Sequence, residues 1–258
     1  STDPDLQRTP IRTPEGVRIR RTFVAPPGYK LISADWSQIE LRVLAHMSQD
    51  PLLLDAFQND HDIHRRTAAQ LFHVSEAEVL PPQREVAKTV NFATIYGQGA
   101  TALAQIIRVP RKIAQEYIDQ YFLTYAGVRQ WLDRTIVQGH DQGYVSTYLG
   151  RRRWIPELSS RNLMERQAGE RIAANTPIQG TAADLCKMAM LNISRAVAER
   201  SLKCRMLMQI HDELVFECQD AQVSQCSELI RQHMQQVAPL SVPLNVNIGV
   251  GQSWAEAH

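Results

Sequence analysis

The chain has 258 residues, 44% of them hydrophobic, and a formal net charge of +1 at pH 7. This length and apolar content suffice for a buried core in one large domain or in two smaller units. The sequence shows no signal peptide and no apolar run long enough to span a membrane, so we expect no membrane partner. Its four cysteines form no close-spaced CxxC pair. This pattern argues against a zinc site or a secreted disulfide framework and favours free, mostly buried thiols in a cytoplasmic protein.

Arginines gather in two places in a chain whose average charge is near zero. They are Arg8, Arg12, Arg18, Arg20 and Arg21 near the start, and the run Arg151, Arg152 and Arg153. Basic strips of this kind suit a surface that binds nucleic acid. The alternative is that these arginines only form solvated charged faces.

Local patterns along the chain predict short strands alternating with helices. Residues 17–36 predict two strands joined by a turn at Ala25-Pro26-Pro27-Gly28, and the second strand, about 30–35, ends at Asp35. Ser37 with Glu40 three residues later is a capping-box pattern, which predicts a helix after Ser37. The later patterns predict helices over 51–58, 62–72, 83–96, 100–107, 110–139, 161–175, 179–200 and 220–237, hairpins over 143–156 and 204–218, and a last strand over 243–250.

These elements predict an α+β fold. Strands from both ends of the chain must meet in one antiparallel sheet, and a helical insertion of about 50–140 lies between them in the sequence.

Two short apolar strands, far apart in the chain, each end on an aspartate. The segment LISADW carries Asp35, and the segment MQIHDELVFE carries Asp212. A carboxylate held at the exit of a buried strand is costly to desolvate without a cation. Two such aspartates side by side would form a site for two Mg²⁺ ions, the arrangement that drives in-line phosphoryl displacement. Nucleotidyl transfer is therefore the leading hypothesis.

The predicted helix over 83–96 carries charged and aromatic side chains at every fourth position, at Arg84, Lys88, Phe92 and Tyr96. On a helix of about 3.6 residues per turn, each such step drifts by only about 40°, so the four share one face. The cations would grip phosphates and the aromatics would stack on a sugar and base. The alternative is an ordinary amphipathic helix with its aromatics in a core.

Three segments together, ADWSQIELR, REVAKTVNFATIYG and HDE, closely resemble the polymerase motifs of the bacterial family A DNA polymerases. The resemblance extends over essentially the whole chain, including NTPIQGTAAD and the final GQSWAEAH. It implies a palm of residues 1–50 and 141–258 that carries the sheet and the aspartates, and helical fingers over 51–140. It also implies that the thumb precedes this chain, which we expect to be the C-terminal piece of a longer protein.

The resemblance further implies the chemistry of the site. Asp35 and Asp212 would hold the two Mg²⁺ ions, and Glu213 would support them. Arg84 and Lys88 would bind the triphosphate of an incoming deoxynucleotide, and Lys88 would also protonate the pyrophosphate.

The same resemblance assigns the remaining contacts to the nucleotide. Phe92 matches the sugar-stacking position, and Tyr96 would guard the templating position. Glu40 matches the glutamate that crowds the sugar 2′ position and rejects ribonucleotides. His64 matches a histidine near the phosphates, and Gln38 is assigned to the same pocket; a lone histidine at a helix start is otherwise more often structural.

The partner that the resemblance implies is primer–template DNA. The residues that would contact it are Arg12, Arg171, Asn175, Gln179, His211, Arg151 and Arg152. We expect a monomer in the bacterial cytoplasm, associated with the nucleoid.

Three functions compete. The first is a DNA-directed DNA polymerase or its catalytic fragment. The second is a non-catalytic remnant that binds DNA or nucleotides, and the third is a metal-dependent nuclease. The third does not explain the helix face from Arg84 to Tyr96.

Overall fold

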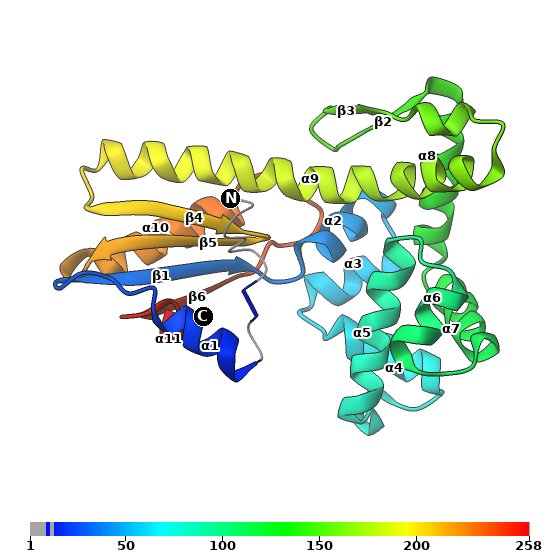
Figure 1. Ribbon diagram of the computed structural model, residues 1–258, viewed down its shortest axis with the longest axis horizontal. Helices are drawn as coiled ribbons and strands as arrows, with labels where there is room; N and C mark the ends of the chain where they lie inside the picture. The colour runs from blue at the N-terminus through cyan, green and yellow to red at the C-terminus, as the bar shows by residue number, and fades with distance from the viewer. Residues whose placement is uncertain (1–8, 11–12, 258) are drawn as a thin grey trace. The chain divides into compact units, whose positions relative to one another are not determined.

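The computed structural model describes residues 9–10 and 13–257 and divides into two compact units (Figure 1). Unit 1 contains the described residues up to Ile39, together with Ala182–Pro239 and the residues from Leu244 onward. Unit 2 contains Glu40–Thr181 and Leu240–Pro243. The division into palm and fingers stays a prediction.

Unit 1 is built on an antiparallel sheet of four strands in the order β4-β5-β1-β6. Its elements are α1 (Pro14–Arg21), β1 (Tyr29–Trp36), β4 (Cys204–Ile210), β5 (Glu213–Gln219), η4 (Asp220–Gln222), α10 (Val223–Gln235), β6 (Val246–Gly251) and α11 (Trp254–Ala257). Strand β1 lies between two strands from the other end of the sequence. The predicted α+β fold with one antiparallel sheet is therefore confirmed.

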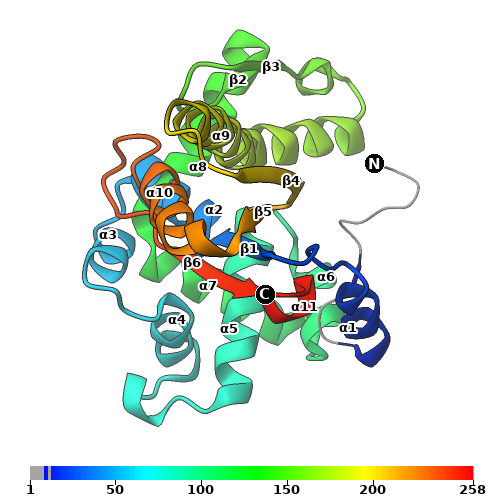
Figure 2. The ribbon, with the colours of Figure 1, turned by 90° about the vertical axis from the view of Figure 1, so that its left-hand side faces the viewer.

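Helices cover both faces of this sheet (Figure 2). On one face lies α10, where the Trp36 indole N–H donates to the Met234 carbonyl at 3.1 Å. On the other face lies α11, where Trp254 packs with Leu31 in a buried apolar cluster. Because side chains alternate along a strand, Asp35 points to the Leu31 face. Both sides of β1 are thus packed, and this holds the end of the strand that carries Asp35.

The prediction of a strand that begins at residue 17 is wrong, because this segment forms α1. The side chain of Thr13 accepts a hydrogen bond from the Gly16 N–H at 3.1 Å, and Pro14 occupies the first helical position. Both features favour a helix start. The Thr-Pro pair was a readable signal, but the alternating side chains that follow it resemble a strand.

Unit 2 is mostly helical. Its elements are α2 (Ile39–Ser48, from Glu40 on), α3 (Pro51–Gln58), α4 (Ile63–Phe72), η2 (Glu76–Glu78), α5 (Pro81–Ile95), α6 (Ala100–Ile107), α7 (Arg111–Thr124), α8 (Ala126–Gln142), β2 (Tyr144–Ser146), β3 (Arg152–Trp154), η3 (Pro156–Ser159) and the first half of α9 (Leu163–Glu199). A capping aspartate precedes both α3 and α4, and a proline also occupies the first position of α3; these features explain why the two helices begin where the sequence predicts.

One predicted helix of unit 2 is wrong in its bounds. The single helix predicted over 110–139 is divided at Tyr125, whose hydroxyl lies 3.0 Å from that of Thr67 in the buried interior. At the break, the Gly127 N–H donates to the Asp50 carboxylate at 2.9 Å. The helix predicted after Ser37 is present and begins at Ile39.

The two helices predicted on either side of Pro177 form one helix, α9. A proline inside a helix usually costs about 3 kcal/mol because it removes a hydrogen bond and crowds the preceding turn. Here the Thr181 hydroxyl donates to the Pro177 carbonyl at 2.5 Å, and the neighbouring side chains of Ala173 and Ile178 are fully buried. Tertiary packing therefore overrides the local signal.

Candidate active site

Unit 1 brings the two predicted metal-binding aspartates together. Asp35 lies one residue before the end of β1, and Asp212 lies in the two-residue turn between β4 and β5. The Trp36 N–H donates to the Asp212 carbonyl at 3.4 Å, and the two carboxyl groups are close enough to share a hydrogen bond. Glu213 is the direct cross-strand partner of Asp35.

The pKa values of these carboxyl groups reflect their crowding. Burial, followed by the negative charges of Asp212 and Glu213, raises the pKa of Asp35 to about 7. Burial also raises the pKa of Asp212. Two desolvated carboxylates side by side favour a cation that offsets their repulsion, and their oxygens are the hard ligands that Mg²⁺ prefers. The donor set therefore fits the predicted metal.

Glu213 is held by internal hydrogen bonds. Its Oε1 accepts from the Ser33 hydroxyl at 2.7 Å and from the Trp254 indole N–H at 2.9 Å, and the residue is only 3% exposed. The guanidinium carbon of Arg20 lies 3.8 Å from the centre of the Trp254 ring. These contacts suit a carboxylate that positions its neighbours. The roles of Ser33 and Trp254 were not predicted from the sequence. Arg20 is buried, so it does not belong to a solvated basic face.

Two further predicted residues of unit 1 lie in turns with left-handed backbone. His211 has φ 53° in the turn beside Asp212, and it is exposed. Gln38 has φ 56° and is partly exposed in the turn between β1 and α2.

In unit 2, the predicted face of α5 is present. Arg84, Lys88, Phe92 and Tyr96 are all partly exposed, whereas the intervening Val90 is buried. The rings of Phe92 and Tyr96 stack with centroids 6.3 Å apart and planes inclined by 24°. The structure thus places two cations and two aromatics along one accessible stripe of the helix.

Asp62 orients the first of these cations. Its Oδ2 accepts a charge-assisted hydrogen bond from Arg84 Nε at 2.7 Å. Its Oδ1 accepts the backbone N–H groups of His64 and Arg65 at 3.0 and 3.1 Å, which caps α4. Asp62 engages Nε, and the terminal nitrogen Nη1 lies 3.6 Å from a carboxylate oxygen of the exposed Glu85.

His64 is buried and held neutral. Desolvation and, to a smaller extent, the positive charge of Arg84 lower its pKa to about 4. Its Nδ1 lies 2.8 Å from the Asn91 amide nitrogen, and the Asn91 oxygen lies 3.0 Å from the Thr67 hydroxyl. Asn91 and Thr67 were not predicted as site residues, because both are uncharged and neither belongs to a recognisable catalytic pattern in the sequence.

The C-terminal end of α5 contacts α2 and α9. The Tyr96 hydroxyl donates to the Glu40 carboxylate, and the Asn175 amide donates to the Tyr96 carbonyl at 3.3 Å. Arg171, Asn175 and Gln179 recur at every fourth position, so they share one face of α9.

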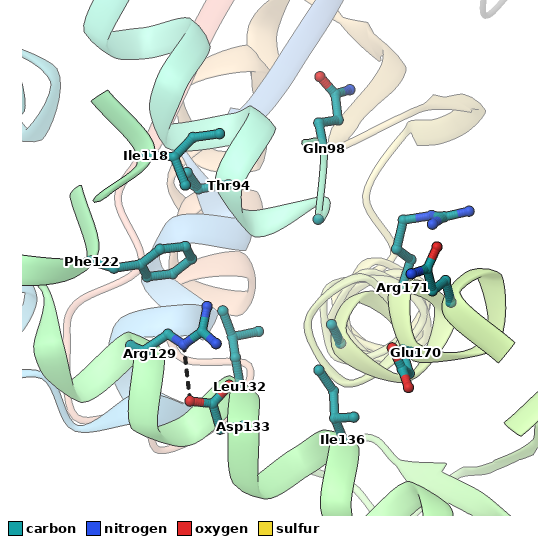
Figure 3. Close-up of a pocket in the computed structure, with 13 residues that line it drawn as sticks. Thr94, Gln98, Ile118, Phe122, Arg129, Leu132, Asp133, Ile136, Glu170 and Arg171 are labelled. Carbon is teal, nitrogen blue, oxygen red and sulfur yellow. Dashed lines mark hydrogen bonds and ion pairs between the residues drawn. The ribbon is translucent and has the colours of Figure 1, made fainter. Parts of the chain in front are cut away.

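A cavity of about 320 Å³ lies beside Arg171 within unit 2 (Figure 3). Apolar side chains of α7 and α8, among them Phe122 and Leu132, form its walls. An ion pair at 2.9 Å between Arg129 and Asp133 lies on its border. One predicted DNA-contacting residue therefore borders a preformed hollow.

The remaining predicted DNA contacts lie on the β2–β3 hairpin or outside the described residues. Arg151 and Arg152 are exposed, and the Arg152 guanidinium carbon lies 4.8 Å from the centre of the Tyr144 ring. Arg12 lies outside the residues that the structure describes.

Comparison with known proteins identifies the family. A profile of DNA polymerase family A matches residues 1–256. The chain belongs to DNA polymerase family A. It is 52% identical over 258 residues to DNA polymerase I of Pseudomonas aeruginosa and 46% identical over 257 residues to the thermostable DNA polymerase I of Thermus aquaticus. The predicted resemblance to bacterial DNA polymerase I is confirmed.

A solved structure supports the same fold. The POL domain of Pol1 from M. smegmatis, in complex with DNA primer-template and dNTP, superposes with a TM-score of 0.95 at 44% identity. The match covers all of this chain and 46% of that one. The chain spans 28% of the P. aeruginosa protein and 31% of the T. aquaticus protein. None of the described helices is long and apolar enough to cross a membrane.

Proposed function

We propose that this chain carries the chemical site of a DNA-directed DNA polymerase, which adds deoxynucleotides to a primer 3′-hydroxyl under the direction of a template. The observation that carries the proposal is the pair of desolvated carboxyl groups, Asp35 and Asp212, in a chain of family A. Two buried carboxylates side by side destabilise the metal-free fold, whereas bound divalent cations would offset their repulsion and take part in the reaction.

Asp35 and Asp212 would hold two Mg²⁺ ions, and Glu213 would fix the strand end beside them. The bound ions would supply charge stabilisation for the attacking and leaving oxygens of an in-line displacement. Lys88 would donate a proton to the pyrophosphate as it leaves. Arg84 would hold the triphosphate through its terminal nitrogens, since its contact with Asp62 uses Nε.

The remaining side chains of unit 2 would select the substrate. Phe92 would stack on the sugar, and Tyr96 would guard the templating position. The contact between Tyr96 and Glu40 supports a joint role, because it holds a carboxylate where it could crowd a 2′-hydroxyl. His64 would meet the phosphates as a neutral hydrogen-bonding group, since its pKa is lowered to about 4. Gln38 would complete the nucleotide contacts.

Primer–template DNA would be the second substrate. Its contacts would come from Arg12, Arg171, Asn175, Gln179, His211, Arg151 and Arg152. Exposed arginines contribute salt-dependent affinity for the phosphate backbone, whereas amide side chains read acceptors in the minor groove that all base pairs share. The monomeric state and the cytoplasmic, nucleoid-associated location stay predictions.

Primer extension on a primed template with deoxynucleotides and Mg²⁺ tests the proposal. We expect extension by the chain, and its loss in Asp212→Ala and Asp35→Asn. Asp220→Ala is the matched control, because Asp220 is an exposed acid of the same unit. Extension that survives in Asp212→Ala would contradict the assigned roles.

Nucleotide binding separates the other outcomes. Absence of extension with Mg²⁺-dependent nucleotide binding retained would mean that the chemical site needs further chain to hold DNA. Loss of both extension and nucleotide binding in a folded protein would refute the polymerase assignment and favour the non-catalytic remnant.

A further inference from the structure

Three cysteines from three elements of unit 1 meet at one point. They are Cys204 at the start of β4, Cys218 near the end of β5, and Cys226 in the second turn of α10. Their sulfur atoms all lie within 4.8 Å of one another. All three are free thiols, as is the fourth cysteine, Cys186 of α9. The cluster was hidden in the sequence, because no two of its members are spaced like a metal-binding pair.

The sheet register creates this cluster. Cys204 and Cys218 are direct cross-strand partners, so their side chains point to the same face of the sheet. That face also carries Phe216, two residues before Cys218, and it is covered by α10, which supplies Cys226. Cys218 and Cys226 are fully buried, whereas Cys204 is partly exposed and offers a route for an ion.

Thiol groups gain little from one another, since S–H is a weak donor and sulfur is a weak acceptor. Burial is the main cause that raises the pKa of Cys204, to about 12, and it also raises the pKa of Cys218. A ligand that replaces the protons must bind sulfur strongly, which is the property of soft d¹⁰ cations.

We propose that Cys204, Cys218 and Cys226 form a three-sulfur binding site for one thiophilic d¹⁰ cation, Zn²⁺ or Cu⁺. Three S–metal bonds form, and the three thiol protons leave to solvent. Three thiolates with Zn²⁺ carry a residual charge of about −1, and water can complete the fourth position on the side of Cys204. Three thiolates with Cu⁺ carry about −2, which burial opposes more strongly. Charge thus favours Zn²⁺, while the sulfur-only donor set also suits Cu⁺.

The site is separate from the candidate active site. It joins the open end of the β4–β5 hairpin to α10, whereas Asp212 lies in the turn that closes the other end of the hairpin. A bound ion would therefore link three elements of unit 1 and stabilise its fold, since it binds only the folded arrangement of the three sulfurs.

Metal titration of the reduced, metal-free chain tests the proposal. Four free thiols are first verified by thiol counting. Zn²⁺ is then added against a chromophoric chelator, Cu⁺ is added against its own chelator without oxygen, and Cd²⁺ is added as a probe whose thiolate bonds absorb in the ultraviolet. We expect one ion per chain, release of protons on binding, and a higher Tm. The two competition experiments decide between Zn²⁺ and Cu⁺.

Substitutions locate the ion. We expect Cys204→Ala, Cys218→Ala and Cys226→Ala each to weaken binding at least about tenfold, the effect of losing one of three ligands. Cys186→Ala is the matched control and should bind like the unsubstituted chain. If the two fully buried positions do not tolerate alanine, Cys204→Ser carries the test, because Cys204 is partly exposed.

Either of two results would overturn the proposal. One is the absence of stoichiometric binding of Zn²⁺, Cu⁺ and Cd²⁺ by a chain whose four thiols are confirmed as free. The other is equal binding by the unsubstituted chain and by a folded Cys204→Ser variant. A cluster that binds no ion but forms a Cys204–Cys218 disulfide under mild oxidation would be a redox pair instead.

Discussion

The neutral state of His64 leads to a pH-dependent stability that can be calculated from the structure. The side chain is 2% exposed, and its pKa is lowered from 6.5 to about 4. Above pH 6.5, His64 is neutral in both the folded and the unfolded chain and contributes nothing to the pH dependence. As the pH falls from 6.5 toward 4, the unfolded chain binds a proton that the folded chain refuses, so stability is lost.

The magnitude follows from this difference. Each pH unit between the two pKa values is worth about 1.4 kcal/mol, so the full loss is about 3 kcal/mol, of which about 2 kcal/mol occurs between pH 7 and 5. The substitution His64→Gln removes the titration and keeps an amide that can accept from Asn91. We therefore expect the variant to lose about 2 kcal/mol less of its free energy of unfolding than the unsubstituted chain does over this interval.

Urea unfolding at pH 7 and pH 5 measures this quantity. His61→Gln is the matched control, since His61 is an exposed histidine in the same unit. An NMR titration of the His64 ring gives an independent reading, with a midpoint near 4 expected. Equal pH-dependent losses in His64→Gln and the unsubstituted chain would refute the reasoning, because His64 would then not be held neutral.

Three further outcomes follow from the contacts of the candidate site. Asp62→Ala removes both the cap of α4 and the partner of Arg84, so we expect a loss of about 1–2 kcal/mol in urea unfolding, most of it recovered in Asp62→Asn. Glu213→Ala leaves two buried donors without an acceptor, so we expect about 2–4 kcal/mol of destabilisation, against about 1 kcal/mol for Glu213→Gln; equal losses would show that the hydrogen bonds are not what matters. Tyr96→Phe removes the hydroxyl that donates to the Glu40 carboxylate, so we expect roughly tenfold poorer selection of deoxynucleotides over ribonucleotides in single-nucleotide extension; an unchanged ratio would show that this hydrogen bond does not contribute to the selection.

Local sequence patterns correctly predicted the helices and strands in which tertiary packing favours the same structure as the local residue preferences. The strand that ends near Asp35 is a short, mostly buried segment that follows a turn, and α3 and α4 begin with a capping aspartate. The four-residue recurrence from Arg84 to Tyr96 correctly placed two cations and two aromatics on one partly exposed face, because α5 is a regular helix over this stretch.

Tertiary contacts explain the elements that the sequence did not reveal. The helix break at Tyr125 depends on a buried hydroxyl contact with Thr67, more than fifty positions away. The continuity of α9 through Pro177 depends on the burial of the residues around it. Neither contact can be read from a window of neighbouring residues. The meeting of Cys204, Cys218 and Cys226 has the same origin, since only the sheet register brings the three sulfurs together.

The carboxylates of the candidate site differ in how far internal hydrogen bonds stabilise them. This difference indicates which of them bind a ligand. Glu213 is satisfied by two internal donors, so it gains little from a cation and acts as a support. Asp35 lies beside two other acids instead, and burial together with the charges of Asp212 and Glu213 raises its pKa to about 7. A fold that keeps this carboxyl pair must tolerate a less stable metal-free state, which is expected where ligand binding rather than packing determines the residues. We therefore assign to the metal the two carboxyl groups whose charged forms are least stable in the metal-free chain.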